Sequence, residues 1–406
     1  MIELDIEKFM TDGYLILRGV ISPEELEPLR ESAETAVRRC FPEGIPEGMF
    51  QPLVRNFNEV IDEETANLVE MFMHEATCGV ASRLMPDAKA VAPAGMFLMC
   101  NPVQEHGPWF WHRDINPETK GPLVGLQQDM LANGPVYLHF NIALYDDDVY
   151  WVVPGSHRRV NTDEENRQLL AVPHGYAHGQ QPQGEKRHEP LPNSISSDLK
   201  AGDLIVNHLE LLHWASDYGT KLRRTFHIGY RSFGGPSFFY EGYNPKPAFG
   251  NYLSPASQAV LAQCAELYDE ELDQIEAVLR TVLARDSAAL IPALAELHPG
   301  ETGRFMGLIH VCKDSQQMHQ GVNPQLAERF TADDIETLWQ RFVPLDEALQ
   351  GDAPDDTPAF QVRAPSRYQL NEMPDYGIED FVASWAQPSA ISGERLIGDS
   401  ASCASK

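Results

Sequence analysis

The sequence predicts an α+β protein in which a block of short strands lies between two sets of helices. Segments where apolar residues alternate with polar ones, bounded by Gly, Pro, Asn or Asp, gather between residues 91 and 240. Apolar residues at helical spacing dominate residues 22–39, 62–84 and 255–348. The chain has 406 residues, 43% of them hydrophobic, so it can bury a large core as one elaborated domain or as two smaller ones.

These patterns divide the chain into four parts. Residues 1–90 hold an N-terminal strand and helices that pack on the core, and residues 91–240 form the strand-rich core. Residues 241–349 form a C-terminal helical extension. Residues 350–406 are rich in Pro, Ser, Asp and Gly, a composition typical of an irregular tail.

The N-terminal part begins with a predicted helical turn and a strand within residues 9–17. Ser22, Pro23 and Glu25 then have the pattern of a helix start, with Ser as N-cap, Pro at N1 and Glu at N3. This helix is predicted to end near Arg39. The other assignments in this part are a loop over residues 41–58 and a helix over residues 62–84.

The core is predicted to contain a strand whose two faces differ. In residues 137–144, Leu and other apolar side chains alternate with Tyr137, His139 and Asn141. A polar face inside a small barrel indicates a ligand cavity, and the alternative is a face exposed to solvent. Other predicted strands cover residues 92–100, 151–153, 204–206 and 222–230, with loops at 115–134 and 161–200 and a solvated turn at 146–148. Predicted C-terminal helices cover residues 256–267, 270–284, 288–297 and 332–349.

Charge and composition exclude some classes of partner. The net charge of −29 argues against nucleic acid or an anionic membrane surface as a partner. The acidic start has no signal-peptide pattern, and no apolar run reaches membrane-spanning length. Six scattered cysteines without a CxxC pair indicate reduced thiols, so we expect a cytoplasmic protein.

A His-x-Asp motif, His112 and Asp114, is the first candidate for chemistry. Alternate residues of an extended segment share a face, so one imidazole and one carboxylate can hold the same metal ion. Two His and one carboxylate are the usual ligands of a non-haem Fe(II) oxygenase. Because the motif is short, it is also compatible with a His and an Asp that merely end a strand.

The second histidine ligand must come from elsewhere, and His213 is the candidate. It follows a Gly-Asp turn at 202–203 and a buried Leu-Ile-Val strand. His157 follows a Pro-Gly turn signal and is a further candidate for a metal ligand. Three more histidines match no zinc-binding spacing, namely His174, His178 and His188.

Together these motifs resemble the phytanoyl-CoA dioxygenase family of Fe(II)- and 2-oxoglutarate-dependent oxygenases. The resemblance covers roughly residues 9–235 and keeps the family's motif order. The matching elements are Phe9-x-x-Asp-Gly-Tyr-Leu with Pro23-Glu-Glu-Leu, Trp111-His-x-Asp, Ala143-Leu with Val152-Val-Pro-Gly-Ser-His, Asp203 followed by His213, and Arg in the next strand.

The resemblance implies a double-stranded β-helix (a jelly-roll, cupin-like fold) for the core, with flanking helices. It implies that His112, Asp114 and His213 bind Fe(II), while 2-oxoglutarate and O2 are co-substrates. It also implies that His157 is a turn residue, and we expect no metal binding there. The reaction it implies is oxidation of an unactivated C–H bond of a small-molecule substrate, with release of succinate and CO2. Asn141 lies where family members place a co-substrate contact.

The co-substrate's far carboxylate needs a cationic partner, and the sequence offers Arg223 and Arg224. On a strand the two point to opposite faces. Arg223 shares a small, polar face with Thr225 and His227, and this Arg-x-Thr pair resembles the carboxylate-binding pair of related oxygenases. We therefore predict that Arg223 and Thr225 bind 2-oxoglutarate, although a one-residue shift of register would exchange the faces.

Several alternatives stay open at this point. Asp114 favours hydroxylation, desaturation or ring formation over halogenation, because family halogenases have a small residue in its place. A non-catalytic jelly-roll binding or scaffold protein is the second hypothesis. A zinc hydrolase or a cupin-type enzyme that does not use 2-oxoglutarate is the third. The sequence specifies no substrate, and the C-terminal helices could form a tailored pocket or a homo-oligomer interface.

Overall fold

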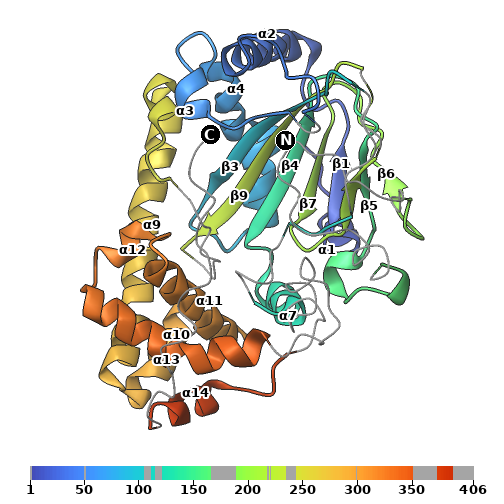
Figure 1. Ribbon diagram of the computed structural model, residues 1–406. Coiled ribbons are helices and arrows are strands. Elements are labelled where there is room, and N and C mark those ends of the chain that lie inside the picture. Colours follow the sequence, from blue (N-terminus) through green and yellow to red (C-terminus); the bar gives the residue numbers. More distant parts are fainter. Residues whose placement is uncertain are drawn as a thin grey trace.

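A computed structural model describes residues 2–49, 52–104, 111–114, 121–165, 189–216, 219, 221–234, 244–298, 300–350 and 373–386. It is an α+β structure (Figure 1). The strands are β1 (Tyr14–Leu17), β2 (Leu53–Val54), β3 (Ala90–Cys100), β4 (Tyr137–Ala143), β5 (Tyr150–Val152), β6 (Ile195–Ser196), β7 (Leu204–His208), β8 (His213–Ala215) and β9 (Arg224–Phe233). The N-terminal and central helices are α1 (Ile6–Asp12), α2 (Pro23–Cys40), α3 (Phe57–Val60), α4 (Ala66–Glu70), η1 (Met71–Met73), η2 (Glu75–Gly79), α5 (Val80–Leu84), α7 (Leu123–Asn133) and η3 (Ser156–Arg158). The C-terminal helices are η4 (Ala248–Tyr252), α9 (Pro255–Ala284), α10 (Ser287–Leu297), α11 (Glu301–His319), α12 (Pro324–Ala327), α13 (Ala332–Gln350) and α14 (Ile378–Ser384).

The described strands form two antiparallel sheets. The larger has the order β1-β7-β4-β9-β3-β2, and the smaller has the order β6-β5-β8. In the larger sheet Asn141 of β4 pairs with His227 of β9, so the polar residues predicted to share a face do lie side by side. Apolar side chains from both sheets, including Tyr14, Tyr150 and Ile205, pack together in one cluster.

The opposite face of the larger sheet packs on the N-terminal helices. Leu138, Phe140 and Ile142 of β4 alternate with its polar residues and join one buried cluster with α2, α4 and α5. Figure 1 shows α2, α3 and α4 at one end of this sheet. The predicted apolar face of residues 137–144 is therefore a packing surface. Helix α2 begins as predicted, with a capping box between Ser22 and Glu25.

The C-terminal helices form a second buried cluster beside the sheet. Helices α9, α10, α11 and α13 bury Leu and Val side chains against one another, and Ala92 and Phe233 of the sheet join them. Residues 255–284 form one helix, where the sequence predicted two. Helix α11 was not predicted, because it is buried on several sides and carries polar residues inward, such as Lys313, which pairs with Asp346 of α13 at 2.5 Å.

Three other sequence assignments need correction. The predicted helix over 62–84 is interrupted at His74, whose backbone is extended (φ −65°, ψ 147°) and whose ring accepts a hydrogen bond from the Ala76 amide. The predicted loop over 115–134 contains helix α7, which packs against α11. Residues 378–384 of the predicted tail form α14, where Phe381 stacks on Phe342 at a centroid distance of 5.0 Å.

The turn into β7 depends on Gly202. Its φ is +88°, and a Cβ there would lie 2.4 Å from the backbone oxygen of Ile21. We expect Gly202→Ala to lower the free energy of unfolding by about 3 kcal/mol, since it adds a backbone clash to left-handed strain. Gly19 (φ +58°) has no atom within 4 Å of the place that a Cβ would take, so Gly19→Ala should cost about 1 kcal/mol. Urea denaturation of both variants measures the difference, and equal costs would contradict the close approach.

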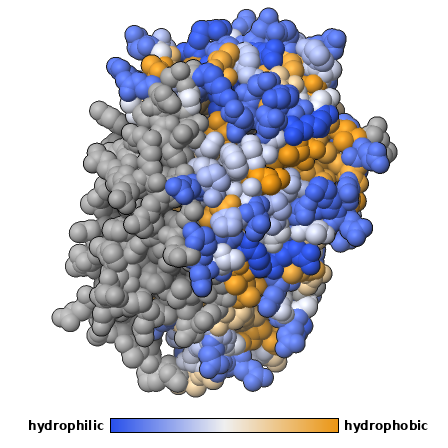
Figure 2. Space-filling model, turned by 90° about the vertical axis from the view of Figure 1, so that its right-hand side faces the viewer, coloured by the Kyte–Doolittle hydropathy of each residue, from blue (hydrophilic) through white to orange (hydrophobic). Residues whose placement is uncertain are grey.

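The outer surface is mixed in character. Figure 2 shows hydrophilic residues over much of the described part of one face, with smaller groups of hydrophobic residues between them. Among the described helices, none combines the length and the apolar character needed to cross a membrane.

Candidate metal centre and co-substrate site

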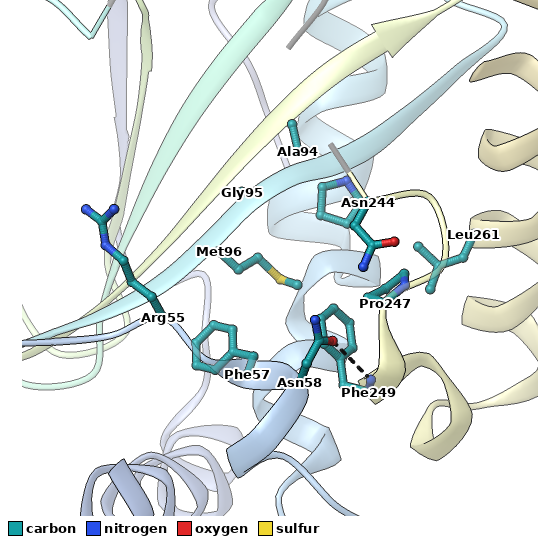
Figure 3. A pocket seen from close by; sticks show the side chains of 11 residues that line it. Arg55, Phe57, Asn58, Ala94, Gly95, Met96, Asn244, Pro247, Phe249 and Leu261 are labelled. Atoms are coloured by element: carbon teal, nitrogen blue, oxygen red, sulfur yellow. Dashed lines mark hydrogen bonds between the residues drawn. The ribbon is translucent and has the colours of Figure 1, made fainter. Parts of the chain in front are cut away.

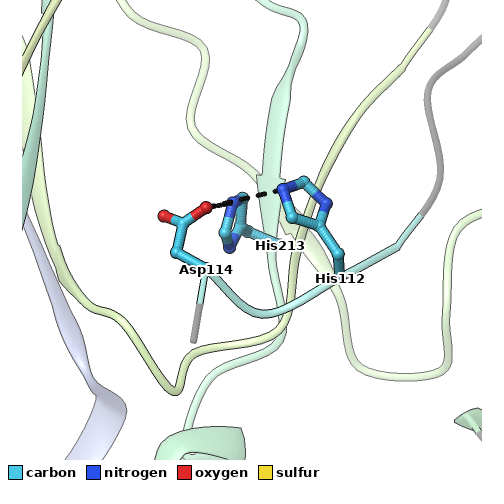
Figure 4. Close-up of side chains that lie close together, drawn as sticks. All are labelled: His112, Asp114 and His213. Carbon is cyan, nitrogen blue, oxygen red and sulfur yellow. Dashed lines mark ion pairs between the residues drawn. The ribbon is translucent and has the colours of Figure 1, made fainter. Parts of the chain in front are cut away.

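Three side chains from two distant segments of the sequence lie close together. His112, Asp114 and His213, here called the metal triad, each offer one ligand atom, and these atoms lie within 4.8 Å of one another. Asp114 Oδ1 lies 3.6 Å from His112 Nε2 and 3.4 Å from His213 Nε2 (Figure 4). Two imidazoles and one carboxylate that face a common point can hold a divalent transition metal.

Backbone hydrogen bonds hold the two segments of the triad together. The amide of each histidine donates to the other's carbonyl, His112 to His213 and His213 to His112, both at 3.0 Å. The turn after β5 supports the segment that carries His213, because Ser156 Oγ accepts a hydrogen bond from the Leu212 amide at 2.8 Å. The Ser156 carbonyl also accepts from the guanidinium of Arg113 at 2.8 Å. The Pro-Gly-Ser-His turn thus positions both ligand segments.

Hydrogen bonds also set which atoms of the triad face the common point. His213 Nδ1 donates to the Leu211 carbonyl at 3.0 Å, which leaves Nε2 toward the other two residues of the triad. Asp114 Oδ2 accepts from His139 Nδ1 at 2.7 Å, which leaves Oδ1 toward the histidines. His139 Nε2 in turn lies 3.2 Å from His227 Nδ1. His139 and His227 therefore form a buried relay that orients the carboxylate.

The electrostatics of the site favour the ionised form of Asp114. Burial raises the pKa of the Asp114 carboxyl, but the imidazoles of His213, His139 and His112 outweigh burial and hold that pKa well below its ordinary value. Burial lowers the pKa of His227 far below its ordinary value, so this ring is neutral at pH 7. Because its pKa is lowered, the carboxylate of Asp114 is ionised at neutral pH.

His139 is a positioning residue for the triad, so its loss should weaken metal binding. We expect His139→Ala to reduce Fe(II) affinity about 10- to 100-fold, because Asp114 loses the donor that fixes its orientation. His139→Gln keeps a donor and should recover much of the affinity. Calorimetric titration of Fe(II) without oxygen measures both variants, and unchanged affinity in His139→Ala would show that Asp114 needs no such partner.

Arg223 and Arg224 point to opposite sides of the sheet, as expected for adjacent strand residues. Arg224 reaches the helical side, where its guanidinium donates to Glu34 of α2 at 2.9 Å. Arg223 lies on the same side as Thr225 and is 4% exposed. Both Arg223 Nε and Thr225 Oγ1 donate to Asp147 Oδ2, at 2.8 and 2.5 Å.

Asp147 is the residue of this site that sequence reasoning missed. The run Asp146-Asp147-Asp148 was predicted to be a solvated turn, and that prediction is wrong for its central member, which is 1% exposed. The Asp146 and Asp148 side chains are indeed exposed. Strict alternation along the chain was the only available signal, because it turns the middle of three successive residues away from its neighbours.

Asn141, predicted to contact the co-substrate, lies on the same face of the sheet. It is fully buried. Its amide lies beside the Tyr150 hydroxyl. Within the described part of the chain, neither the oxygen nor the nitrogen of this amide makes a hydrogen bond of ordinary geometry. A buried amide of this kind can bind a polar ligand.

The structure separates the other sequence candidates from the triad. His157 lies in η3, and its Nε2 binds the Met10 carbonyl at 3.1 Å, as expected for a turn residue. Trp111 and Trp214, the neighbours of two of the triad residues, stack on each other in a buried cluster, at a centroid distance of 5.2 Å. Outside the described residues lie His174, His178 and His188.

A cavity of about 200 Å³ lies on the other side of β3 (Figure 3). Arg55, Asn58, Met96 and Asn244 contribute to its lining, and no residue of the metal triad does. Phe97, the neighbour of Met96, stacks on His227 with a centroid distance of 4.4 Å. The strand β3 therefore separates this cavity from the buried relay.

A comparison with models of protein families identifies the family to which the chain belongs. The family model described as phytanoyl-CoA dioxygenase (PhyH) matches residues 9–226, more than half of the sequence. The chain belongs to this family. The resemblance to this family inferred from the sequence is thus confirmed. The whole metal triad, Thr225 and Arg223 lie inside the matched residues of the PhyH family.

Solved structures with a similar arrangement are distant from this PhyH family chain. The epimerase SnoN from nogalamycin biosynthesis is 16% identical over 56% of this chain and 80% of its own, with a TM-score of 0.38. AviO1 from Streptomyces viridochromogenes Tue57 is 20% identical over 57% and 95%, with a TM-score of 0.40. EctD from S. alaskensis, with 2-oxoglutarate and 5-hydroxyectoine, is 17% identical over 60% and 78%, with a TM-score of 0.40. These likenesses carry no argument about function. No curated protein sequence matches the chain.

Proposed function

We propose that this protein is an Fe(II)- and 2-oxoglutarate-dependent dioxygenase that hydroxylates, or otherwise oxidises, an unactivated C–H bond of a small organic metabolite. The observation that carries the proposal is the convergence of His112, Asp114 and His213 within 4.8 Å in a member of the PhyH family. Two imidazoles and one carboxylate leave coordination positions open for a co-substrate and O2. Succinate and CO2 are the expected co-products.

The residues present fit an iron ion and a 2-oxo dicarboxylic acid. His112 and His213 would hold the metal through Nε2, and Asp114 through Oδ1, since the other atoms of His213 and Asp114 have partners. When bound, Fe(II) supplies the redox chemistry that activates O2. Arg223 and Thr225 supply donors for the far carboxylate of the co-substrate, and the amide of Asn141 supplies a further polar contact.

The chain's own residues prepare this site for chemistry. His213, His227 and Asn141 are buried, whereas the side chains of His112, Asp114 and His139 are partly exposed. The triad can therefore be reached from solvent, while the residues behind it are shielded from water. The His139 and His227 relay fixes the Asp114 carboxylate, so the triad is organised before any ligand arrives.

Release of succinate tests the proposed function. Protein purified without oxygen should contain iron or take up one Fe(II) per chain. It should then convert 2-oxoglutarate to succinate in the presence of its substrate. A screen of amino acids, phosphonates, acyl-thioesters and secondary-metabolite scaffolds, read by succinate formation, identifies the substrate class. A protein that binds zinc and hydrolyses substrate without 2-oxoglutarate would support the cupin-type alternative, and one that binds ligands without turnover would support a scaffold role.

The carboxylate of Asp114 makes oxygen insertion or C–H oxidation the expected outcome rather than halogenation. It takes the coordination position that a halide would need. Incubation with the true substrate and chloride or bromide should therefore give only oxidised product. Mass spectrometry that detects a halogenated product would contradict this assignment.

The finer features of the architecture are part of the same proposal. We propose that the two antiparallel sheets are the two halves of a double-stranded β-helix, with the triad between them. We also propose the division into residues 1–90, 91–240, 241–349 and 350–406. The C-terminal helices are proposed as the contact surface of a homo-oligomer, which sedimentation of the full chain and of an α13 surface variant would test.

A further inference from the structure

The donors predicted to bind the co-substrate carboxylate hold a carboxylate of the chain itself. Asp147 Oδ2 accepts from Arg223 Nε at 2.8 Å and from Thr225 Oγ1 at 2.5 Å, and Asp147 Oδ1 accepts from the Val149 amide at 3.0 Å. These charge-assisted bonds are of the kind that a bound dicarboxylic acid would make with an Arg-x-Thr pair.

Asp147 is fixed in this place by its backbone. Its amide donates to the Leu199 carbonyl, and the Leu199 amide donates to its carbonyl, each at 2.8 Å. The negative charge therefore stays beside Arg223 whatever else binds there. Solvent cannot screen it, because Asp147 is 1% exposed and Arg223 is 4% exposed.

The surroundings of the pair are largely apolar. Met99 and Val149 form a small hydrophobic cluster here, and Arg223 Nη1 lies 3.8 Å from Met99 Sδ. In such surroundings like charges repel more strongly than in water. The guanidinium of Arg223 and the carboxylate of Asp147 together carry no net charge, so the site attracts an incoming carboxylate less than an uncompensated arginine would.

We propose that Asp147 sets the affinity and selectivity of the co-substrate site by competing with the far carboxylate of 2-oxoglutarate for Arg223 and Thr225. This inference rests on the proposed function, because it requires a 2-oxo acid as co-substrate. Its consequence is that 2-oxoglutarate binds more weakly than the bare Arg-x-Thr pair would allow. A 2-oxo acid without the far carboxylate does not experience this competition.

The test is the substitution Asp147→Asn, which removes the charge and keeps the shape. Calorimetry of the Fe(II)-loaded protein without oxygen measures the Kd of 2-oxoglutarate and of 2-oxopentanoate, which has a methyl group in place of the far carboxylate. We expect Asp147→Asn to lower the Kd of 2-oxoglutarate about tenfold or more. The Kd of 2-oxopentanoate should change by less than about twofold, since this acid has no far carboxylate that could bind Arg223.

Two neighbouring residues provide matched controls. Asp146→Asn and Asp148→Asn remove the same charge from exposed side chains, so solvent screening should leave both Kd values within about twofold of the wild type. If Asp147→Asn does not unfold cooperatively, Asp147→Ser carries the same test.

The outcomes separate this inference from the proposed function. Weaker or unchanged 2-oxoglutarate binding in Asp147→Asn overturns the competition, as does an equal gain for 2-oxopentanoate. In both cases the wild type still binds 2-oxoglutarate, and the proposed function stands. If neither 2-oxo acid binds wild-type or variant protein although iron binds, the proposed function itself fails, and the competition fails with it.

Discussion

Replacement of any one residue of the metal triad is expected to abolish iron binding and turnover. His112→Ala, Asp114→Ala and His213→Ala should each lower Fe(II) affinity by more than about 100-fold, since loss even of a residue that only orients a ligand costs 10- to 100-fold. The three ligand atoms lie within 4.8 Å of one another, so each variant leaves only two ligands. Anaerobic calorimetry and succinate release measure the two effects.

A buried histidine outside the triad is the control for this prediction. His157 is fully buried, but its ring binds the Met10 carbonyl. His157→Ala should therefore still take up one Fe(II) per chain. Circular dichroism and cooperative thermal unfolding establish that each variant is folded. Full activity in a triad variant, or loss of iron in folded His157→Ala, would mean that the ligands have been misassigned.

Loss of Arg223 is expected to raise the 2-oxoglutarate requirement steeply. A charge-assisted pair in a desolvated pocket contributes on the order of 2–5 kcal/mol, which corresponds to roughly 30- to several-thousand-fold in affinity. Arg223→Ala also leaves the Asp147 carboxylate without its cation, so the remaining site repels a carboxylate. The KM for 2-oxoglutarate in succinate formation, together with its Kd by calorimetry, measures the effect.

Arg224 provides the matched control one residue away. Its guanidinium binds Glu34 and Asn101 on the other side of the sheet, so Arg224→Ala should change the KM for 2-oxoglutarate little. Because Arg223→Ala leaves a buried charge unpaired, it is also expected to lower the free energy of unfolding by about 3–5 kcal/mol. The double variant Arg223→Ala with Asp147→Asn removes both charges and should recover much of that stability. A larger KM effect in Arg224→Ala would contradict the assignment of the anchor.

The metal triad could be predicted from the sequence because its determinants are local. His-x-Asp places two ligands on one side of an extended segment, and a Gly-Asp turn before a buried strand marks the segment that carries His213. The face assignment of Arg223 followed from alternation within a single strand, and the structure agrees with it. The role of Arg223 and Thr225 in binding co-substrate stays a prediction.

The features that the sequence did not reveal depend on contacts between distant residues. Asp147 is buried because its backbone pairs with Leu199 and its side chain meets Arg223, and nothing in a run of three aspartates indicates either partner. Helix α11 has no clear apolar stripe because other helices cover several of its sides. The aromatic residues Trp111 and Trp214 meet only because the two ligand segments pair.

The position of the bound metal tests the central claim most directly. Crystals grown without oxygen, with Fe(II) and 2-oxoglutarate, allow anomalous diffraction at the iron edge to locate the ion. We predict one strong peak per chain at coordination distance from His112 Nε2, Asp114 Oδ1 and His213 Nε2. An iron peak elsewhere, or an iron ion held by fewer than these three side chains, would contradict the account.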